Sequence, residues 1–366
     1  VAIQALAKHY LDSLNAKIIA ITGSNGKTTT KDIITGLLET KFKVHKTQGN
    51  FNNELGVPLT ILAAPEDSDI LVLEMGADNF GQLDFLSKLV KPDYTIITNI
   101  GESHIEFFGS RAGIAKAKFE ITNGMKKDGF FVYNGDEPLL KELVENSSIN
   151  ATSCGENSYN DIILENYTIT RDKIDFKLNI DKNSFSTTLK GKHNLFNIMF
   201  AVAIAKKIGL ANEEIRHAID NISKITNMRL ESITYGEDSL IINDAYNASP
   251  TSMKAAVDVI SDLNDFEFKT LVLGSMFELG PNEVEYHSGV GTYINNNSRG
   301  INLVISVGTL AKNITDNINN KDINTLHFST VEEVTDYLKA NKHKNEVILF
   351  KASRSMKLET IINDIK

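Results

Sequence analysis

The stretch KIIAITGSNGKTTT, residues 17–30, has the pattern of a strand, a phosphate-binding loop and the start of a helix. Its apolar run at 18–21 is mostly β-branched and unbroken, which is typical of a strand buried on both faces of a parallel sheet. Gly23 and Gly26 would let the loop backbone approach an anion closely, and Lys27 would bring a positive charge to the phosphates. The spacing G-x-x-G-K-T is shorter than the general phosphate-loop pattern, so a chance glycine-rich turn is the alternative interpretation.

Thr28 follows the loop and could hold a magnesium ion through its hydroxyl oxygen. A helix that begins near Thr28 would also point its unpaired N–H groups and the positive end of its dipole at the same phosphates. The strand before the loop and the helix after it strengthen the match. The stretch therefore predicts a site for a nucleotide with magnesium.

Length and composition indicate a globular protein of more than one domain. A chain of 366 residues is too long for one ordinary core and predicts two or three domains. With 42% apolar and 23% charged residues, and no apolar run long enough to cross a bilayer, we do not expect membrane insertion. The net charge of −9, with no basic run to offset it, argues against nucleic acid as a partner. The one cysteine, Cys154, excludes an internal disulfide, and we expect a cytoplasmic monomer.

Alternating strand and helix patterns predict a doubly wound α/β fold with a parallel sheet. Period-two segments between 162 and 189 predict an antiparallel hairpin at the sheet edge. A boundary near Ser223 to Asn227 separates an expected central domain, 1–223, from a smaller Rossmann-like α/β domain, 224–366. The expected strands are 18–21, 70–74, 94–100, 130–133, 173–180, 184–189, 240–243, 270–273, 303–307 and 347–350, and the expected helices include 1–15, 194–208 and 212–222, the last with Asn212 as its cap.

Three residues near the expected strand ends are candidates for a metal site. Glu74 ends a strand, and because the carboxyl ends of parallel strands meet at one edge of a sheet, its carboxylate should face the phosphate loop. An acidic residue that caps a turn is the alternative. His104 should emerge at the same edge, although a lone loop histidine is often a surface residue. Lys118 is a third candidate, but Lys116 and Lys126 are equally plausible from the sequence. The residues alone favour an ordinary solvated lysine at position 118.

Polar residues later in the chain are candidates for ligand binding. Asn194 and Asn197 lie on one helix face and suit a purine edge, although N-capping by Asn194 explains half of the pattern. The segment NDAYN, 243–247, follows one strand end, and Ser353 with Arg354 follows another, so both should face a crevice. A surface arginine at a helix start is the alternative for Arg354.

Five segments, taken in order, resemble the Mur ligases of bacterial cell-wall synthesis. The resemblance runs from Ile18 to the end of the chain, and the ordered set is far more specific than a phosphate loop alone. It implies an ATP-binding Mur ligase middle domain at 1–223 and a C-terminal ligase domain at 224–366. The segments are TGSNGKTTTK (22–31), GNFNNELGVPLT (49–60), EMG with NIGESHIEFFGSRAGIAKAKFEI (74–76 and 99–121), GKHNLFN (191–197), and NDAYNASPTSM with FELG and SRSMKLE (243–253, 277–280 and 353–359).

The resemblance implies an ATP-dependent amide ligase that works through an acyl phosphate. Within the family, NDAYNASPTSM favours the branch that joins D-alanyl-D-alanine to UDP-N-acetylmuramoyl-tripeptide in peptidoglycan precursor synthesis, so these two molecules are the expected partners. The alternatives are a diamino-acid-adding Mur ligase, a folylpolyglutamate synthase, or a relative that binds ATP without turnover. The reaction requires that water be kept from the acyl phosphate, and we expect domain closure about a hinge at 223–227.

The same resemblance implies the catalytic and metal-binding residues. Lys27, Glu74, His104 and Lys118 are expected to be catalytic, and Thr28 is expected to bind magnesium together with the last three. Lys118 is expected to be carbamylated, which would turn a cation into a carboxylate-like group beside a second magnesium. Because magnesium prefers oxygen ligands to histidine, manganese is expected to substitute well.

Nucleotide and dipeptide contacts are also carried over from the resemblance. The residues expected to bind the phosphates of ATP are Gly23, Ser24, Asn25, Gly26, Lys27, Thr28 and Thr29. Those expected to bind the rest of the nucleotide are Asn194 and Asn197 at the adenine, Arg229 at the phosphates, Asp244 at the ribose and Tyr246 near the base. Those expected to bind the dipeptide are Asn247, Ser353 and Arg354.

Two residues depart from the family pattern. Ser275 stands where the family usually has aspartate, and Ala352 where it usually has glycine. If that glycine needs a positive φ or a close approach of the ligand, Ala352 would strain the loop that positions Arg354. The family also carries an N-terminal domain for the uridine nucleotide. Because this chain starts after it, we expect residues 1–366 alone to bind the nucleotide substrate poorly.

Overall fold

The computed structural model describes residues 2–222, 226–236 and 238–366, and the chain divides into two compact units. Unit 1 consists of Val1–Thr168, Ile174–Thr188 and His193–Lys224, and unit 2 of Ile169–Lys173, Leu189–Lys192 and Ile225–Lys366. The expected domain boundary and hinge include residues 223–225, which lie outside the described residues, so both stay predictions. Among the described helices, none is both long and apolar enough to cross a membrane.

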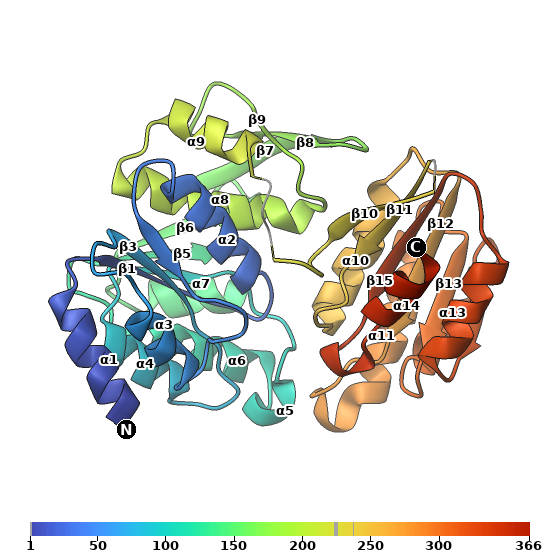
Figure 1. Ribbon diagram of the computed structural model, residues 1–366, viewed down its shortest axis with the longest axis horizontal. Coiled ribbons are helices and arrows are strands. Elements are labelled where there is room, and N and C mark those ends of the chain that lie inside the picture. Colours follow the sequence, from blue (N-terminus) through green and yellow to red (C-terminus); the bar gives the residue numbers. More distant parts are fainter. Residues whose placement is uncertain (1, 223–225, 237) are drawn as a thin grey trace. The chain divides into compact units, whose positions relative to one another are not determined.

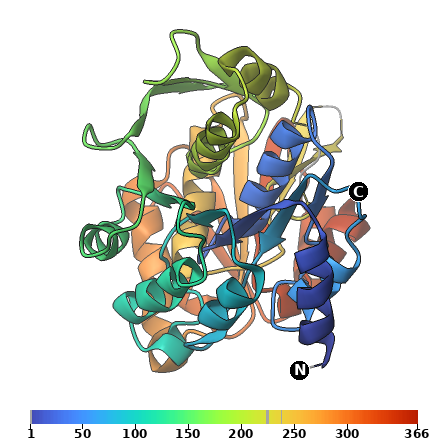
Figure 2. The ribbon, with the colours of Figure 1, turned by 90° about the vertical axis from the view of Figure 1, so that its left-hand side faces the viewer.

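Unit 1 contains a nine-stranded sheet with helices on both faces (Figures 1 and 2). Its strands are β1 (Lys17–Thr22), β2 (Val44–Lys46), β3 (Ile70–Glu74), β4 (Tyr94–Ile97), β5 (Phe130–Asn134), β6 (Ala151–Gly155), β7 (Ile162–Ile169), β8 (Ile174–Leu178) and β9 (Phe185–Thr187). Its helices are α1 (Ala2–Ser13), α2 (Lys27–Leu38), α3 (Gly56–Leu62), α4 (Gln82–Val90), α5 (Ile105–Phe108), α6 (Arg111–Phe119), α7 (Pro138–Glu145), α8 (Lys192–Ile208) and α9 (Asn212–Asp220). The strand order is β2-β3-β1-β4-β5-β6-β7-β8-β9.

The position of β1 in this sheet decides where the phosphate loop lies. β1 pairs in parallel with β3 on one side and with β4 on the other, and Ile21 is in register with Glu74. The carboxyl ends of all three strands therefore meet around the loop that follows β1. β8 and β9 pair antiparallel near the sheet edge. The predicted α/β class, with its parallel sheet and antiparallel edge, is confirmed.

The two faces of β1 are both covered, as its apolar run predicts. Ile18 and Ala20 belong to a core cluster to which α1, α3, α4, α6 and α7 contribute. Ile19 and Ile21 point to the opposite face, where they are fully buried. Because both faces of the strand are covered, neither set of alternate side chains faces water, and the sequence is apolar throughout rather than alternating between apolar and polar residues.

Two details differ from the sequence expectations. β4 ends at Ile97 rather than at residue 100, because Thr98 and Asn99 turn away to contact the phosphate loop. Helix α9 is not capped by Asn212, its first helical residue. Instead Glu214 accepts a hydrogen bond from the backbone N–H of Ala211 (2.7 Å).

Unit 2 contains a six-stranded sheet in the order β10-β11-β15-β12-β13-β14. Its strands are β10 (Glu231–Tyr235), β11 (Ser239–Asn243), β12 (Phe268–Gly274), β13 (Leu303–Val307), β14 (Asn324–Phe328) and β15 (Glu346–Lys351). Its helices are α10 (Pro250–Asp262), α11 (Glu283–Asn297), α12 (Lys312–Thr315), α13 (Val331–Ala340) and α14 (Glu359–Ile365). All neighbouring strands are parallel except β10 and β11.

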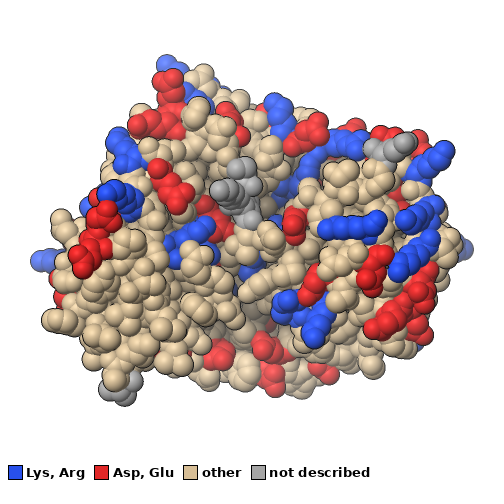
Figure 3. Space-filling view, in the orientation of Figure 1, with Lys and Arg blue, Asp and Glu red and all other residues tan. Residues whose placement is uncertain are grey.

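Helices cover both faces of this second sheet (Figure 1). α13 and α14 share one core cluster with strand residues such as Ile305 and Phe350, while α10, α11 and α12 pack on one another and on the strands. The carboxyl ends of β11 and β15 lie side by side, since Asn243 is in register with Phe350. The segments that follow these two strands are therefore neighbours. Figure 3 shows basic and acidic side chains interspersed over one face of the molecule.

Candidate active site

The loop between β1 and α2 has a backbone that requires glycine at two positions. Gly23 and Gly26 have φ values of 149° and 80°, in the region that favours glycine. A Cβ atom at position 23 would lie 1.9 Å from Thr98 Oγ1, and one at position 26 would lie 2.6 Å from Asn197 Oδ1. The chance-turn interpretation does not account for a loop packed this closely between a central strand and a helix.

Replacing Gly23 by alanine is expected to destabilise unit 1 and to weaken nucleotide binding, because the added methyl group collides with Thr98 and the backbone conformation is strained. The matched control is Gly36→Ala in α2, where a Cβ meets nothing within 4 Å and φ is not positive. That change should raise stability by about 0.5–1 kcal/mol. Thermal unfolding and nucleotide titration of both variants check this, and equal behaviour of the two would contradict it.

Two side chains that directly follow β4 hold the phosphate loop by hydrogen bonds, and they were not predicted from the sequence as site residues. Thr98 Oγ1 donates to the Asn25 carbonyl (2.5 Å), and Asn99 Oδ1 accepts from the Asn25 N–H (2.9 Å). Asn99 Nδ2 also donates to the Asn25 carbonyl (3.1 Å). Both polar groups of the Asn25 backbone are thus held by a neighbouring strand end. The loop is pre-shaped before any ligand enters.

Lys27, Thr28 and Glu74 come together at the end of β1. Lys27 Nζ donates to the Gly23 carbonyl (2.8 Å), so its side chain folds back over the loop. Thr28 Oγ1 donates to Glu74 Oε2 (2.8 Å). Glu74 is 3% exposed and lies within β3, so the turn-capping alternative for this residue is wrong.

Two residues that sequence reasoning missed hold Glu74 in place. Asn52 Nδ2 donates to Glu74 Oε1 (3.0 Å), and the Glu74 backbone N–H donates to Thr47 Oγ1 (3.0 Å). The buried Lys31 in turn donates to the Thr47 carbonyl (2.9 Å). Asn52 lies inside the motif GNFNNELGVPLT, which could have suggested it, whereas nothing in the sequence marks Thr47.

The donor set beside the loop suits a hard cation. Thr28 contributes a hydroxyl and Glu74 a buried carboxylate, and oxygen donors of this kind are those magnesium prefers. The described residues contain no group of three or more His, Cys, Asp and Glu side chains spaced to hold a metal ion. His104 directly precedes α5 as its N-cap residue, with a φ of 61°, and is half-buried; its role as a ligand stays a prediction.

Lys118 is a buried lysine, and the expectation of an ordinary solvated side chain is wrong. It is 2% exposed on α6, whereas Lys116 on the same helix is exposed. Burial, reinforced by the positive charge of Lys27, holds the pKa of the Lys118 ammonium well below its ordinary value. Among the described residues, no carboxylate forms an ion pair with it. A neutral amine is therefore the form that this environment favours.

Asn194 and Asn197 are buried inside α8 and form a chain that reaches the loop helix. The N-cap interpretation of Asn194 is wrong, because α8 already begins at Lys192. Asn197 Nδ2 donates to Asn194 Oδ1 (2.8 Å), and Thr30 Oγ1 donates to Asn197 Oδ1 (3.2 Å). The two amides therefore lie next to α2, with Asn197 beside Gly26 of the phosphate loop.

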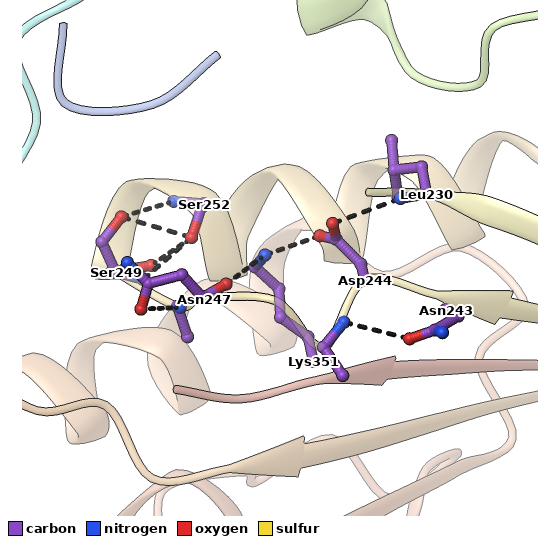
Figure 4. A network of polar contacts seen from close by, with 9 residues as sticks. Leu230, Asn243, Asp244, Asn247, Ser249, Ser252 and Lys351 are labelled. Carbon is purple, nitrogen blue, oxygen red and sulfur yellow. Dashed lines mark hydrogen bonds and ion pairs between the residues drawn. The ribbon is translucent and has the colours of Figure 1, made fainter. Parts of the chain in front are cut away.

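In unit 2, the candidate nucleotide residues gather at the carboxyl ends of β11 and β15. Asp244 lies between Lys351 and the backbone of Leu230, as Figure 4 shows, with Lys351 Nζ 2.6 Å from Asp244 Oδ2. The guanidinium of Arg229 stacks over the ring of Tyr246 (4.3 Å). Lys351 is 3% exposed and was not predicted as a site residue.

The two departures from the family pattern are accommodated without backbone strain. Ala352 does not have a positive φ, so the expectation of strain from that cause is wrong, while strain from a close approach of the ligand stays a prediction. Its methyl group fits because position 274 is glycine, where a Cβ would lie 2.6 Å from Ala352 Cβ. Ser275 Oγ accepts the Ala311 N–H (3.3 Å), and its carbonyl accepts the Ser353 N–H (3.1 Å). Arg354 is exposed and pairs with Glu359 (2.5 Å).

Two family models match the chain in the order in which these sites occur. The Mur ligase middle domain matches residues 21–205, and the model described as "Mur ligase, glutamate ligase domain" matches residues 228–354. The chain therefore belongs to the Mur ligase family, as the resemblance predicted, and it is a ligase of peptidoglycan precursor synthesis.

Its relatives point to one branch of that family. The UDP-N-acetylmuramoyl-tripeptide–D-alanyl-D-alanine ligase of Bacillus subtilis is 45% identical over 372 residues, which cover 100% of this chain and 79% of that protein. The structure of MurF from Acinetobacter baumannii matches with a TM-score of 0.90 at 29% identity, covering 100% of this chain and 80% of the other. MurF ligase from Thermotoga maritima, in complex with ADP, matches with a TM-score of 0.88 at 29% identity, covering 100% and 82%.

Proposed function

We propose that this ligase joins D-alanyl-D-alanine to UDP-N-acetylmuramoyl-tripeptide and converts ATP to ADP and phosphate. The observation that carries the proposal is the phosphate loop after β1, with Glu74 of β3 hydrogen-bonded to Thr28 at the start of α2. This arrangement suits phosphoryl transfer, in which the protein mainly positions groups and neutralises charge. The name of the Bacillus subtilis relative supplies the two substrates.

In the first step, a carboxylate oxygen of the tripeptide attacks the γ-phosphorus of ATP. The bond between the γ-phosphorus and its bridging oxygen breaks, ADP leaves with the electron pair, and an acyl phosphate forms. Lys27 and the N–H groups at the start of α2 neutralise charge on the transferring group. The fastened backbone of Asn25 keeps these donors in place, so little reorganisation is needed at the moment of reaction.

In the second step, the amine of D-alanyl-D-alanine attacks the acyl carbon. An amide bond forms, the carbon–oxygen bond to the phosphoryl group breaks, phosphate leaves, and the amine loses a proton. Asn247, Ser353 and Arg354 are proposed to orient the dipeptide. The Arg354 guanidinium suits its carboxylate, and the exposure of Arg354 lets it reach a ligand.

Magnesium is proposed to bind at Thr28 and Glu74, with His104 and a carbamylated Lys118 as further ligands and manganese as a substitute. When bound, it draws charge from the phosphate oxygens as a Lewis acid. Lys118 fits the carbamate proposal because a depressed pKa leaves more neutral amine to react with CO2. The nitrogen forms a bond to the CO2 carbon and releases a proton, and the buried neutral amine becomes an anion.

The remaining proposed contacts concern the nucleotide. The loop from Gly23 to Thr29 is proposed to bind the ATP phosphates, with Arg229 as a further contact. Asn194 and Asn197 are proposed at the adenine, Tyr246 near the base and Asp244 at the ribose. We further propose that the enzyme acts in the cytoplasm, where ATP and the uridine nucleotide are found, and that it is a monomer.

Phosphate release from ATP and magnesium tests the proposal, with the protein expressed from its whole gene. Release is expected only when UDP-N-acetylmuramoyl-tripeptide and D-alanyl-D-alanine are both present. A diamino acid with the shorter UDP-linked peptide, and glutamate with a folate, serve as competing substrate pairs. Release with either pair but not with D-alanyl-D-alanine would assign another branch of the family. ATP binding without turnover on any pair would favour a non-catalytic relative.

A further inference from the structure

A buried lysine holds the segment that is proposed to bind the ribose. Lys351 is the last residue of β15, and Asp244 follows β11, the parallel neighbour of β15. Lys351 Nζ lies 2.6 Å from Asp244 Oδ2 and donates to the Asn247 carbonyl at 3.0 Å (Figure 4). One ammonium group therefore fixes both ends of the turn from 244 to 247.

Among the residues that the structure describes, the contacts of Asp244 use about half of its hydrogen-bonding capacity. Its Oδ1 accepts the Leu230 N–H at 3.3 Å and its Oδ2 accepts Lys351, whereas a carboxylate can accept about four hydrogen bonds. One lone pair on each oxygen therefore stays available, and the Asp244 side chain is 18% exposed. Two acceptors of fixed orientation suit the two adjacent hydroxyl groups of a ribose.

Burying the ion pair between Lys351 and Asp244 is also unfavourable enough that its presence calls for an explanation. Lys351 is 3% exposed, and taking an ammonium and a carboxylate out of water is unfavourable unless both are well paired. An apolar side chain at position 351 would pack at the same strand end without that cost. The ion pair instead sets the direction in which the Asp244 carboxylate points, and the same ammonium ties down Asn247 beside the proposed dipeptide site.

We propose that Lys351 is a positioning residue for the nucleotide, which orients Asp244 toward the ribose hydroxyls and fixes the turn that follows β11. The inference rests on the proposed function, in which Asp244 binds the ribose. Lys351 does not contact the nucleotide itself. Its loss should therefore reduce recognition of the ribose more than recognition of the phosphates.

The test compares Lys351→Met with a matched buried lysine. Lys269 lies on β12 of the same sheet, is 4% exposed, and donates to the carbonyls of Ser261 (3.2 Å) and Arg299 (3.1 Å) rather than to a carboxylate. Lys269→Met measures the general effect of removing a buried lysine. Binding of ADP and of 2′-deoxy-ADP is measured by calorimetry, and KM for ATP and for D-alanyl-D-alanine by phosphate release.

Lys351→Met is expected to weaken ADP binding and raise KM for ATP by about 10- to 100-fold, the usual range for losing a hydrogen bond to a charged group. It should also lose most of the parent's preference for ADP over 2′-deoxy-ADP, while kcat at saturating ATP changes much less. Lys269→Met should keep the parent's preference even if it melts earlier. If Lys351→Met does not fold, Lys351→Gln carries the same expectation, since it keeps a donor for Asn247 but no charge for Asp244.

The outcomes separate this inference from the proposed function. If the parent prefers ADP over 2′-deoxy-ADP and Lys351→Met keeps that preference and its affinity, the positioning role is overturned. If the parent binds ADP without any preference, or if Asp244→Asn leaves the preference intact, the ribose assignment of Asp244 fails and the inference fails with it. A double-mutant cycle between Lys351→Met and Asp244→Asn should be strongly non-additive, and additivity would count against the inference.

Discussion

Lys27→Ala is expected to lower kcat for ATP-dependent ligation by about 10²- to 10³-fold or more. Lys27 is the first residue of α2 and its ammonium lies over the phosphate loop, 2.8 Å from the Gly23 carbonyl. Without that charge, the transferring phosphoryl group loses a cation that the loop holds in a fixed position. Phosphate release in the presence of both substrates measures the effect.

The fold should tolerate this change, since Lys27 is half-buried and donates to the backbone carbonyls of Gly23 and Ser24 in its own loop. The matched control is Lys41→Ala, just beyond the end of α2. The side chain of Lys41 is 49% exposed and pairs with Glu214 at 3.5 Å, an interaction worth little in water. Unchanged melting and normal ligation are expected for Lys41→Ala. Ligation near the parent rate by Lys27→Ala would contradict the proposed mechanism.

Lys118→Ala is expected to lower kcat by about 10²-fold or more, because it removes the group that is proposed to carry a negative charge near the metal. Lys116→Ala is the matched control, since Lys116 is exposed on the same helix, two residues earlier. Acetate or formate should restore part of the activity of Lys118→Ala, because a small carboxylate can occupy the space of the missing carbamate. Equal activity of the two alanine variants would contradict the proposal.

The carbamate also predicts how activity depends on pH and CO2. The depressed pKa of Lys118 keeps its amine neutral to lower pH than the amine of an ordinary lysine. As the pH falls further, however, protons compete with CO2 for the amine, and the protonated amine cannot form a carbamate. Activity should therefore decline on the acid side, and added bicarbonate should move that decline to lower pH. The same profile in CO2-free buffer and in bicarbonate would argue against carbamylation.

Much of the fold and part of the site follow from the sequence because they depend on local patterns. The apolar run at 18–21 predicts a central strand, and the strand 70–74 is found with the predicted bounds as β3. Glu74 was predicted to face the loop because parallel strand ends share an edge, and the structure places it 2.8 Å from Thr28 Oγ1. Rules that relate neighbouring strands were sufficient for this pair.

The partners of these residues could not be predicted, because they depend on which distant segments the fold brings together. Thr47, which directly follows β2, accepts a hydrogen bond from the Glu74 backbone, and Lys351 pairs with Asp244 across 107 positions of sequence. Burial of Lys118 depends on how α6 packs, so the residues alone favoured the wrong, solvated state. The cap assigned to Asn194 was wrong because α8 begins two residues earlier, a difference that side-chain propensity does not determine.

The contact between Gly274 and Ala352 makes the two positions epistatic. A methyl group at position 274 would lie 2.6 Å from Ala352 Cβ, so alanine is excluded there for as long as 352 is alanine. Ala352→Gly removes the obstacle and introduces no collision of its own. A change from glycine at 274 with alanine at 352 to the reverse combination must therefore follow one order, in which position 352 loses its methyl group before position 274 gains one.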